Sequence, residues 1–226
     1  MKINFKRILI FGLIVGLGLL LIEYAFKIDE KTLMAYYFKI ALAVLILILI
    51  INTAYFLFYS KKLKEALALF YAGKTKEYVA SMEKLLSKAK GSHLKNILKL
   101  NLAAGYLEDK SYTKAKDTLD QVDLDRLKNS DLKLVYYINL AICYFKVEDF
   151  ASFKEIYADE KDLFEKYVDH KSYGQSISEI KIMAYLIDED FESATKLLSE
   201  TREKYSDQRF QESYADLERL IKKYRE

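Results

Sequence analysis

The chain has 226 residues, of which 52% are hydrophobic and 31% charged, and its formal net charge is +3. It contains no proline, no tryptophan and one cysteine, which excludes a disordered, a collagen-like or a disulfide-stapled protein. Residues 1–59 carry six cations and three anions, and residues 60–226 carry 30 of each. Because the second part has no net charge and no long run of lysine or arginine, nothing in it favours nucleic acid as a partner.

The first predicted element is an apolar segment near the N-terminus. Every residue from Ile8 to Ile22 is apolar or glycine. Extended to Phe26, the segment forms a helix of about 28 Å, close to the thickness of a bilayer's hydrocarbon core. We therefore predict a first membrane span over residues 8–26. The alternative is a cleaved signal peptide, against which no small-x-small triplet follows the apolar run.

The second predicted element is an uncharged segment from Ile40 to Ser60. Its length matches the hydrocarbon core, which predicts a second span over residues 40–59 and a transmembrane hairpin over residues 1–60. Cations precede the first span, and Lys61, Lys62 and Lys64 follow the second. The positive-inside rule then predicts a multi-pass protein of the plasma membrane with both termini in the cytoplasm and the lipid bilayer as one partner.

Gly12 and Gly16 form a GxxxG motif in the first predicted span. In lipid, small residues allow two helices to approach closely, so the motif is typical of helix association. One interpretation is contact with a second copy of the chain, giving a homo-oligomer, or with another membrane protein. The other is packing against the second span of the same chain.

From Leu63 onward the apolar residues follow helical spacing, with no long alternating run. This pattern predicts an all-helical fold with helices of about 10 to 17 residues. No helix breaker lies between Leu33 and Ala72, so the second span is predicted to continue unbroken into the first helix beyond it. The breaks expected further on are Gly73, Gly91-Ser92, Asn129-Ser130-Asp131, Lys171-Ser172-Tyr173-Gly174 and Ser206-Asp207.

The helical part contains internal repeats. The segments 101–112 and 139–150 both read N-L-A-x-x-Y, followed by five residues and an aromatic residue. A third copy ends at Phe191 and a degenerate first copy at Tyr78, so the aromatics of the second helices stand at 78, 112, 150 and 191. The intervals are unequal, and Phe153 stands where the other copies have a small residue.

This pattern resembles tetratricopeptide repeats (TPR), and the resemblance covers residues 61–204. It implies an α-solenoid of about four helix pairs, in which a small residue such as Ala103 or Ala141 lets paired helices pack closely. The segment 205–226 is amphipathic and is predicted to be a capping helix over the last apolar surface.

Searching the sequence for catalytic or metal-binding chemistry gives no candidate, so we predict neither an enzyme nor a bound cofactor or metal. Phosphate-binding, zinc-protease, CxxC and GxSxG motifs are absent. His93 and His170 have no second His or Cys at ligand spacing. Cys143 lies within the repeat pattern and is expected to be a buried, inert thiol. The acidic clusters recur at the turn between helices, which favours N-caps and solvated corners over catalytic acid pairs.

A partner-binding site follows from the resemblance. In such repeats the first helices line a concave groove, and the Asn of N-L-x-x-x-Y can hydrogen-bond to the backbone of a bound peptide. The resemblance therefore implies Asn101 and Asn139 as the principal contacts. Lysines that hold a peptide carboxylate in some relatives are absent at the matching places, which favours an apolar helix or strand as ligand. The other implied groove residues are Leu100, Ala104, Leu107, Ile138, Ile142 and Phe145.

Together these features predict a membrane-anchored cytoplasmic scaffold or adaptor that binds a partner protein in its repeat groove. The alternative is a structural or regulatory subunit of a larger membrane complex that associates through its transmembrane helices. The Lys-, Ile- and Tyr-rich, proline-free composition favours a bacterial origin.

Overall fold

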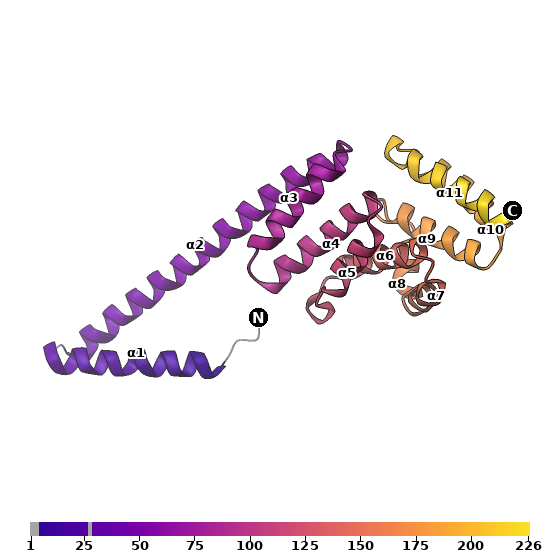
Figure 1. Cartoon of the computed structure of the whole chain (residues 1–226). Helices are drawn as coiled ribbons and strands as arrows, with labels where there is room; N and C mark the ends of the chain where they lie inside the picture. The colour runs from indigo at the N-terminus through magenta and orange to yellow at the C-terminus, as the bar shows by residue number, and fades with distance from the viewer. Residues whose placement is uncertain (1–4, 27–28) are drawn as a thin grey trace. The chain divides into compact units, whose positions relative to one another are not determined.

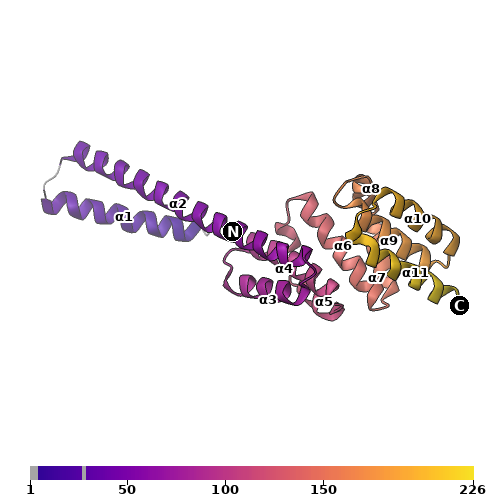
Figure 2. The same ribbon diagram turned by 90° about the horizontal axis from the view of Figure 1, so that it is seen from above.

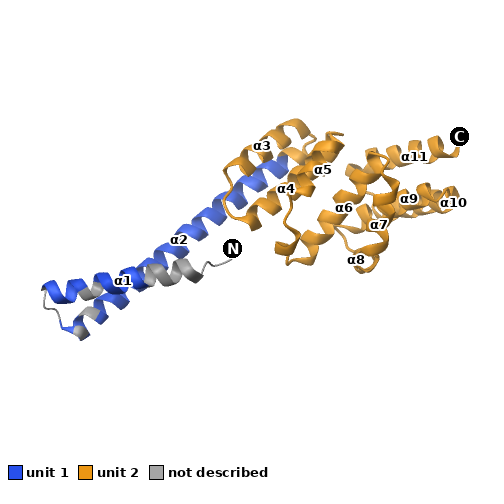
Figure 3. Cartoon of the chain, turned by 60° about the horizontal axis from the view of Figure 1, so that its bottom comes forward, with its two compact units in different colours: residues 1–68 blue, residues 69–226 orange. Residues whose placement is uncertain are grey.

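The computed structural model describes the backbone of residues 5–26 and 29–226, and the side chains of residues 13–18, 21–25, 29, 31, 32 and 34–226. Over these residues the secondary structure is entirely helical, as predicted (Figure 1). The chain divides into two compact units, residues 1–68 and residues 69–226 (Figure 3). The division lies inside a helix, further along the chain than the change in composition at Lys61.

The first unit contains helix α1 (Phe5–Phe26) and most of helix α2 (Glu30–Tyr71). Helix α2 has 42 residues without a break and is about 63 Å long. Its sequence holds neither glycine nor proline, and the Asp29 side chain accepts a hydrogen bond from the Thr32 amide at its start (3.0 Å). The prediction of one unbroken helix from Leu33 onward is therefore confirmed.

Helix α2 contains the stretch in the described chain that is long and apolar enough to cross a membrane, within Met34–Tyr71, and none of its most apolar window is buried. Leu45, Leu47 and Leu49 are each more than half exposed. The described apolar part of α1, Leu13–Ala25, is shorter. The first predicted span, over residues 8–26, therefore stays a prediction.

The second unit contains the last three residues of α2, followed by short helices joined by tight turns (Figure 2). Its helices begin and end at the predicted breaks at Gly73, Gly91-Ser92, Asn129, Gly174 and Ser206-Asp207. The helices are α3 (Thr75–Lys88), α4 (Ser92–Glu108), α5 (Tyr112–Asp120), η1 (Leu124–Arg126), α6 (Ser130–Lys146), α7 (Phe150–Asp159), α8 (Lys161–Tyr167), α9 (Gly174–Ile187), α10 (Phe191–Lys204), η2 (Gln208–Phe210) and α11 (Gln211–Arg225).

The packing of these helices follows a regular order. Helices α4, α6 and α9 each contact the helix that follows them, which is α5, α7 or α10. Helix α6 also contacts α4 on one side and α9 on the other, and α11 contacts both α9 and α10. Tyr214, Leu217 and Ile221 on α11 are buried in a core that extends back to Leu134 on α6. The amphipathic face predicted for the C-terminal segment is thus its buried face.

The turns between these helices repeat one geometry. Among the described non-glycine residues, Lys110, Glu148 and Glu189 have positive φ, at 59°, 59° and 58°. At Lys110 the amide donates to the carbonyl of Leu107, and the next amide donates to that of Tyr106; the same two bonds recur around Glu148, Glu189 and Gly73. This is the αL turn that ends many helices.

The residue after the αL position is the N-cap of the next helix. The Asp149 carboxylate accepts a hydrogen bond from the Ser152 amide (3.2 Å), and the Asp190 carboxylate accepts one from the Ser193 amide (3.0 Å). The prediction that the acidic clusters supply N-caps is confirmed at these two turns.

The structure has one helix break that is not among the predicted ones, between Phe150 and Lys171. The chain breaks at Glu160, whose φ and ψ are −102° and 17°, and continues as the short helix α8. This break places Phe153 of α7 and Phe164 of α8 together in the core, where both are almost fully buried. The extra helix also accounts for the long interval before the aromatic residue at 191.

Candidate binding site

A cavity of about 320 Å³ lies in the second unit, with walls from α4, α6, α9 and α11. Glu212, Ser213, Asp216 and Leu217, in the first half of α11, contribute to this wall. The Arg209 guanidinium, just before α11, lies over the ring of Tyr71 (5.7 Å to the centroid). Near the other end of α11, Tyr224 stacks on Phe145 with ring centroids 6.3 Å apart. The first helices α4, α6 and α9 of the repeat pattern thus share one cavity with the start of α11.

Glu179 on α9 is the most buried ionisable group in this cavity, with 8% of its surface exposed. Its Oε1 atom accepts hydrogen bonds from Gln175 Nε2 (2.6 Å), one turn earlier on α9, and from Ser213 Oγ on α11. Burial raises the pKa of the Glu179 carboxyl, against the opposing effects of these two hydrogen bonds and of Lys146. The carboxyl thus links α9 directly to α11 inside the cavity wall.

Two further charged groups of the wall, on neighbouring helices, have shifted pKa values. Burial lowers the pKa of Lys146 on α6, against the attraction of Asp216 and Glu179. Burial also raises the pKa of Glu108 on α4, and the negative charge of Glu212 on α11 raises it further. The cavity combines partly desolvated groups of both signs with apolar walls, as in many ligand sites.

The structure brings four of the predicted groove residues together on this cavity: Ala104 and Leu107 from α4, and Asn139 and Ile142 from α6. Asn139 is buried to 7% exposure, and its Nδ2 donates to the carbonyl of Leu100 (3.3 Å). Its amide group therefore joins α6 to α4 at the edge of the cavity.

The other predicted contacts lie elsewhere. Asn101 is not in the cavity wall; its Nδ2 donates to the Ile97 carbonyl of the same helix (2.8 Å), and its own carbonyl accepts from Tyr78 Oη (2.8 Å). Leu100, Ile138 and Phe145 are 1%, 6% and 2% exposed. Their side chains pack between helices, which corrects the expectation that they line an open groove.

Of the two motif glycines, Gly16 lies in α1 with nothing within 4 Å of the place where a Cβ atom would stand. The same is true of Gly18. Gly12 also falls within α1, but its surroundings lie outside the described residues.

The residues that α9 and α11 contribute to the cavity were not predicted from the sequence. Glu179 stands between Ile177 and Ile180, and both isoleucines are buried. A carboxylate one residue before a buried isoleucine, in a helix that buries Ile177, Ile180 and Met183, was a signal for a buried polar site. Ser213 and Asp216 were overlooked because the C-terminal helix was interpreted only through its apolar face.

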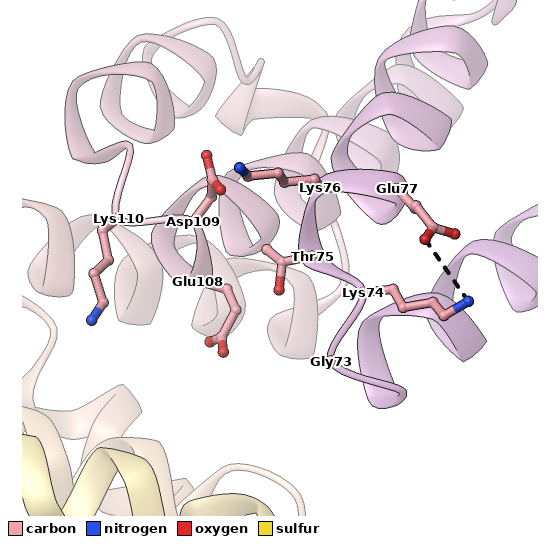
Figure 4. Close-up of a pocket in the computed structure, with 8 residues that line it drawn as sticks. All are labelled: Gly73, Lys74, Thr75, Lys76, Glu77, Glu108, Asp109 and Lys110. Carbon is pink, nitrogen blue, oxygen red and sulfur yellow. Dashed lines mark ion pairs between the residues drawn. The ribbon is translucent and has the colours of Figure 1, made fainter.

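A second hollow, of about 440 Å³, lies between the turn before α3 and the turn after α4 (Figure 4). Gly73 to Glu77 and Glu108 to Lys110 line it. Lys74 and Glu77 form an ion pair at its rim (3.8 Å), with more than half of each side chain exposed. Because its charged side chains are mostly exposed, this hollow offers weaker contacts than the cavity around Glu179.

The remaining groups that could take part in chemistry are the Cys143 thiol and possible metal ligands. Cys143 is buried, as predicted, and burial raises the pKa of its thiol to about 12, so the thiolate is scarce at neutral pH. Within the residues that the structure describes, no group of three or more His, Cys, Asp or Glu side chains is placed to hold a metal ion.

Comparisons with protein-family models, with curated proteins and with solved structures give no match for this chain.

Proposed function

We propose that this chain is a membrane-anchored adaptor that holds a partner protein close to a bilayer. In this proposal α1 and α2 form a transmembrane hairpin in the plasma membrane, and both termini lie in the cytoplasm. Residues 61–204 form a TPR-like solenoid, with residues 205–226 as its capping helix. A segment of the partner inserts into the cavity between α4, α6, α9 and α11.

The exposed surface of α2 supports the anchor. Its apolar side chains surround the helix and are about half exposed along residues 40–51. Such a surface is unstable in water and is typical of a helix that meets lipid on all sides.

The recurring turn supports the solenoid. Gly73 and three αL residues end α2, α4, α6 and α9 with the same hydrogen bonds. Helices α4, α6 and α9 each pack on the helix that follows and on a neighbouring first helix. That pattern of contacts is the one expected of stacked helical repeats.

The cavity is the main support for the proposal that the chain binds a partner protein. Its volume, about 320 Å³, lies at the low end for ligand sites, which have roughly 300–1,000 Å³. It has room for one or two side chains of a partner segment, which is less than the whole helix or strand that the sequence favours. Its mixed lining of Asn139, Lys146 and Glu179 suits a segment that carries polar groups as well as apolar ones.

Site-specific photocrosslinking in cells tests this function. A photoreactive amino acid at Leu107, in the cavity wall, is expected to crosslink one partner protein. The same amino acid at Glu155, exposed on α7, is the matched control and is expected to give no such product. Adding Ala104→Trp, which fills the cavity, should abolish the crosslink from Leu107. A product that persists with Ala104→Trp, or that forms equally from Glu155, contradicts binding in the cavity.

The second candidate function is that of a subunit joined to a membrane complex through α1. The space around Gly16 and Gly18 favours it, because a glycine packed on α2 would have neighbouring atoms within van der Waals distance. Gly16→Leu should then dissociate the complex in detergent, as measured by native mass spectrometry, while the crosslink from Leu107 stays unchanged. If Gly16→Leu leaves the assembled mass intact, association does not use this face of α1.

A further inference from the structure

The hairpin of α3 and α4 ends in four lysines and a histidine that we call the basic tip: Lys84, Lys88, Lys90, His93 and Lys95. The first two stand on the last turns of α3, Lys90 lies in the connection, and the other two stand on the first turns of α4. All five side chains are exposed. Because they fall within 12 consecutive residues at one helix reversal, their charges act at one place on the surface.

The basic tip belongs to a larger separation of charge along the chain. Residues 61–99 contain ten lysines and three glutamates, whereas residues 100–226 contain 20 cations and 27 anions. The neutral total for residues 60–226 therefore conceals a basic first part and an acidic remainder. The second unit is electrically polar, with its positive end at its first hairpin.

The acidic groups next to the basic tip are already engaged. The Glu83 carboxylate accepts a hydrogen bond from Tyr106 Oη (2.5 Å). In the loop packed beside α4, Asp123 forms an ion pair with Arg126 (2.8 Å), and Arg126 also donates to Ser92 Oγ (2.5 Å). Asp125 and Lys128 of that loop offset each other in charge. Within the described residues, Lys84, Lys88 and Lys95 form no ion pair, so their charges are available to a partner.

We propose that the basic tip binds the anionic lipid headgroups of the membrane in which α2 is anchored. This inference rests on the membrane anchor proposed above. Lys61, Lys62 and Lys64 follow the apolar stretch directly, and the tip begins 24 residues after Ser60. Clusters of four to eight cations next to a membrane helix are attracted to anionic lipid by about 1 kcal/mol per Lys or Arg.

The side chains of the tip favour lipid over nucleic acid. Lysine is a flexible point charge that needs no fixed geometry in its partner, and the tip contains no arginine. Residues 84–95 include no aromatic residue other than His93, so the tip lacks the stacking surface of single-strand binders. The acidic remainder would be repelled by the same headgroups, which orients the unit with its basic tip toward the bilayer.

The test uses the full chain reconstituted in nanodiscs of phosphatidylcholine, alone or mixed with phosphatidylglycerol. A donor dye is attached at Ser87→Cys, in the tip, or at the control position Ser199→Cys, exposed on α10, and the lipids carry an acceptor dye on their headgroups. Cys143 is buried and should remain unlabelled. Energy transfer from position 87 is expected to rise with phosphatidylglycerol and to fall again in about 0.5 M salt, which screens charges beyond a few Å.

A charge-reversal variant makes the result specific. Lys84→Glu with Lys88→Glu and Lys95→Glu should lower the ratio of bound to unbound tips about 100-fold or more, which removes the rise. The matched control, Lys133→Glu with Lys181→Glu and Lys196→Glu, changes the total charge equally at exposed positions outside the tip and should keep the rise.

Three results would overturn the proposal. They are equal energy transfer in the two lipid compositions, equal behaviour of the two triple variants, and loss of the rise when an equimolar amount of a single-stranded oligonucleotide is added, which would assign the tip to nucleic acid. Failure of the anchor is seen separately, because a chain without an anchor does not float with phosphatidylcholine vesicles after alkaline carbonate treatment. A chain that floats but shows no lipid-dependent transfer refutes the tip alone.

Discussion

Helix α2 and the helices of the second unit use the same apolar residues in opposite ways. Leu45, Leu47 and Leu49 in α2 are more than half exposed, whereas Leu98 and Leu134 in the second unit are fully buried. The difference lies in the pattern, because α2 is apolar on all sides over residues 40–51 and the later helices are apolar on one face. Periodicity, more than hydrophobicity, separates the exposed surface that we propose meets lipid from the surfaces that pack on protein.

The largest effect is expected from charges placed in the middle of α2. Leu45→Lys with Leu49→Lys should cost about 5–7 kcal/mol of membrane insertion, from roughly 2.5–3.5 kcal/mol for each lysine at the centre of a span. The protein should then leave the membrane pellet on alkaline carbonate extraction. As a control, Ala151→Lys with Thr195→Lys adds two lysines at exposed positions of the second unit and should leave extraction unchanged. If the double α2 variant stays in the pellet, the result contradicts the proposal that α2 spans the membrane.

The next largest effect is expected in the core of the second unit. Phe153 is fully buried against Phe145 and Tyr157, so Phe153→Ala should lower the free energy of unfolding by about 3–5 kcal/mol. Urea unfolding of the full chain in detergent micelles, followed by near-ultraviolet circular dichroism, measures this. Phe58→Ala in α2, where the ring is 55% exposed, removes the same atoms and should leave that transition unchanged. Equal losses in the two variants would show that exposure does not distinguish the two regions.

The sequence predicts most helix boundaries because they rest on local chemistry. Gly73 and Gly91 adopt positive φ, and the Asn129 side chain caps α6 by accepting hydrogen bonds from two amides. The continuity of α2 follows from its lack of breakers. The break at Glu160 could not be predicted from local sequence, because glutamate is an ordinary helix former. The helix ends there because the break allows Phe164 to pack in the core.

The candidate site was predictable only in part. Ala104, Leu107, Asn139 and Ile142 follow from the repeat pattern, and all four line the cavity. The pattern cannot show which neighbouring positions are covered by the next helix, and Leu100 and Ile138 are covered. Asn101 and Asn139 occupy equivalent positions, yet one bonds within its own helix and the other bonds to the neighbouring helix. Long-range packing makes that difference.

A smaller, pH-dependent effect is expected from Glu179, the buried ionisable group that joins α9 to α11. Its pKa is raised from the usual 4.5, so the folded state retains a proton that the unfolded state loses as the pH rises above that value. The contribution of Glu179 to the stability of the wild type therefore falls as the pH rises from about 5 to 8. Glu179→Gln cannot ionise, so the stability of the variant relative to the wild type should rise over that range.

Thermal unfolding at the two pH values measures this difference. Glu108 and Lys146 are present in both proteins, so their own titrations largely cancel in the comparison. Glu155→Gln, an exposed substitution on α7, is the control and should change stability equally at both pH values. If Glu179→Gln behaves as Glu155→Gln does, then the carboxyl is solvated, and the cavity wall differs from the one described.

The smallest effects on stability are expected at the turns of the second unit. Helix α2 continues for 42 residues without a turn, whereas the chain of the second unit reverses direction at αL turns. Lys110, Glu148 and Glu189 each hold a positive φ that costs an ordinary L-residue about 1–2 kcal/mol relative to glycine. Part of that gain is lost to the greater freedom of glycine in the unfolded chain, so each single substitution to glycine should stabilise the unit by about 0.5–1 kcal/mol. Urea unfolding of the full chain in micelles measures each change.

Asp109→Gly is the matched control, because Asp109 precedes Lys110 and has a φ of −76°, which costs aspartate nothing. That substitution should destabilise the unit by about 0.5–1 kcal/mol. The ion pair that Glu148 forms with Lys223 is long, at 3.9 Å, and exposed, so its loss should not mask the gain at that turn. Three equal gains in the free energy of unfolding would show that the three turns are stabilised in the same way, as expected of structural repeats. A gain at one turn and losses at the others would mean that the shared backbone geometry is held by different local forces.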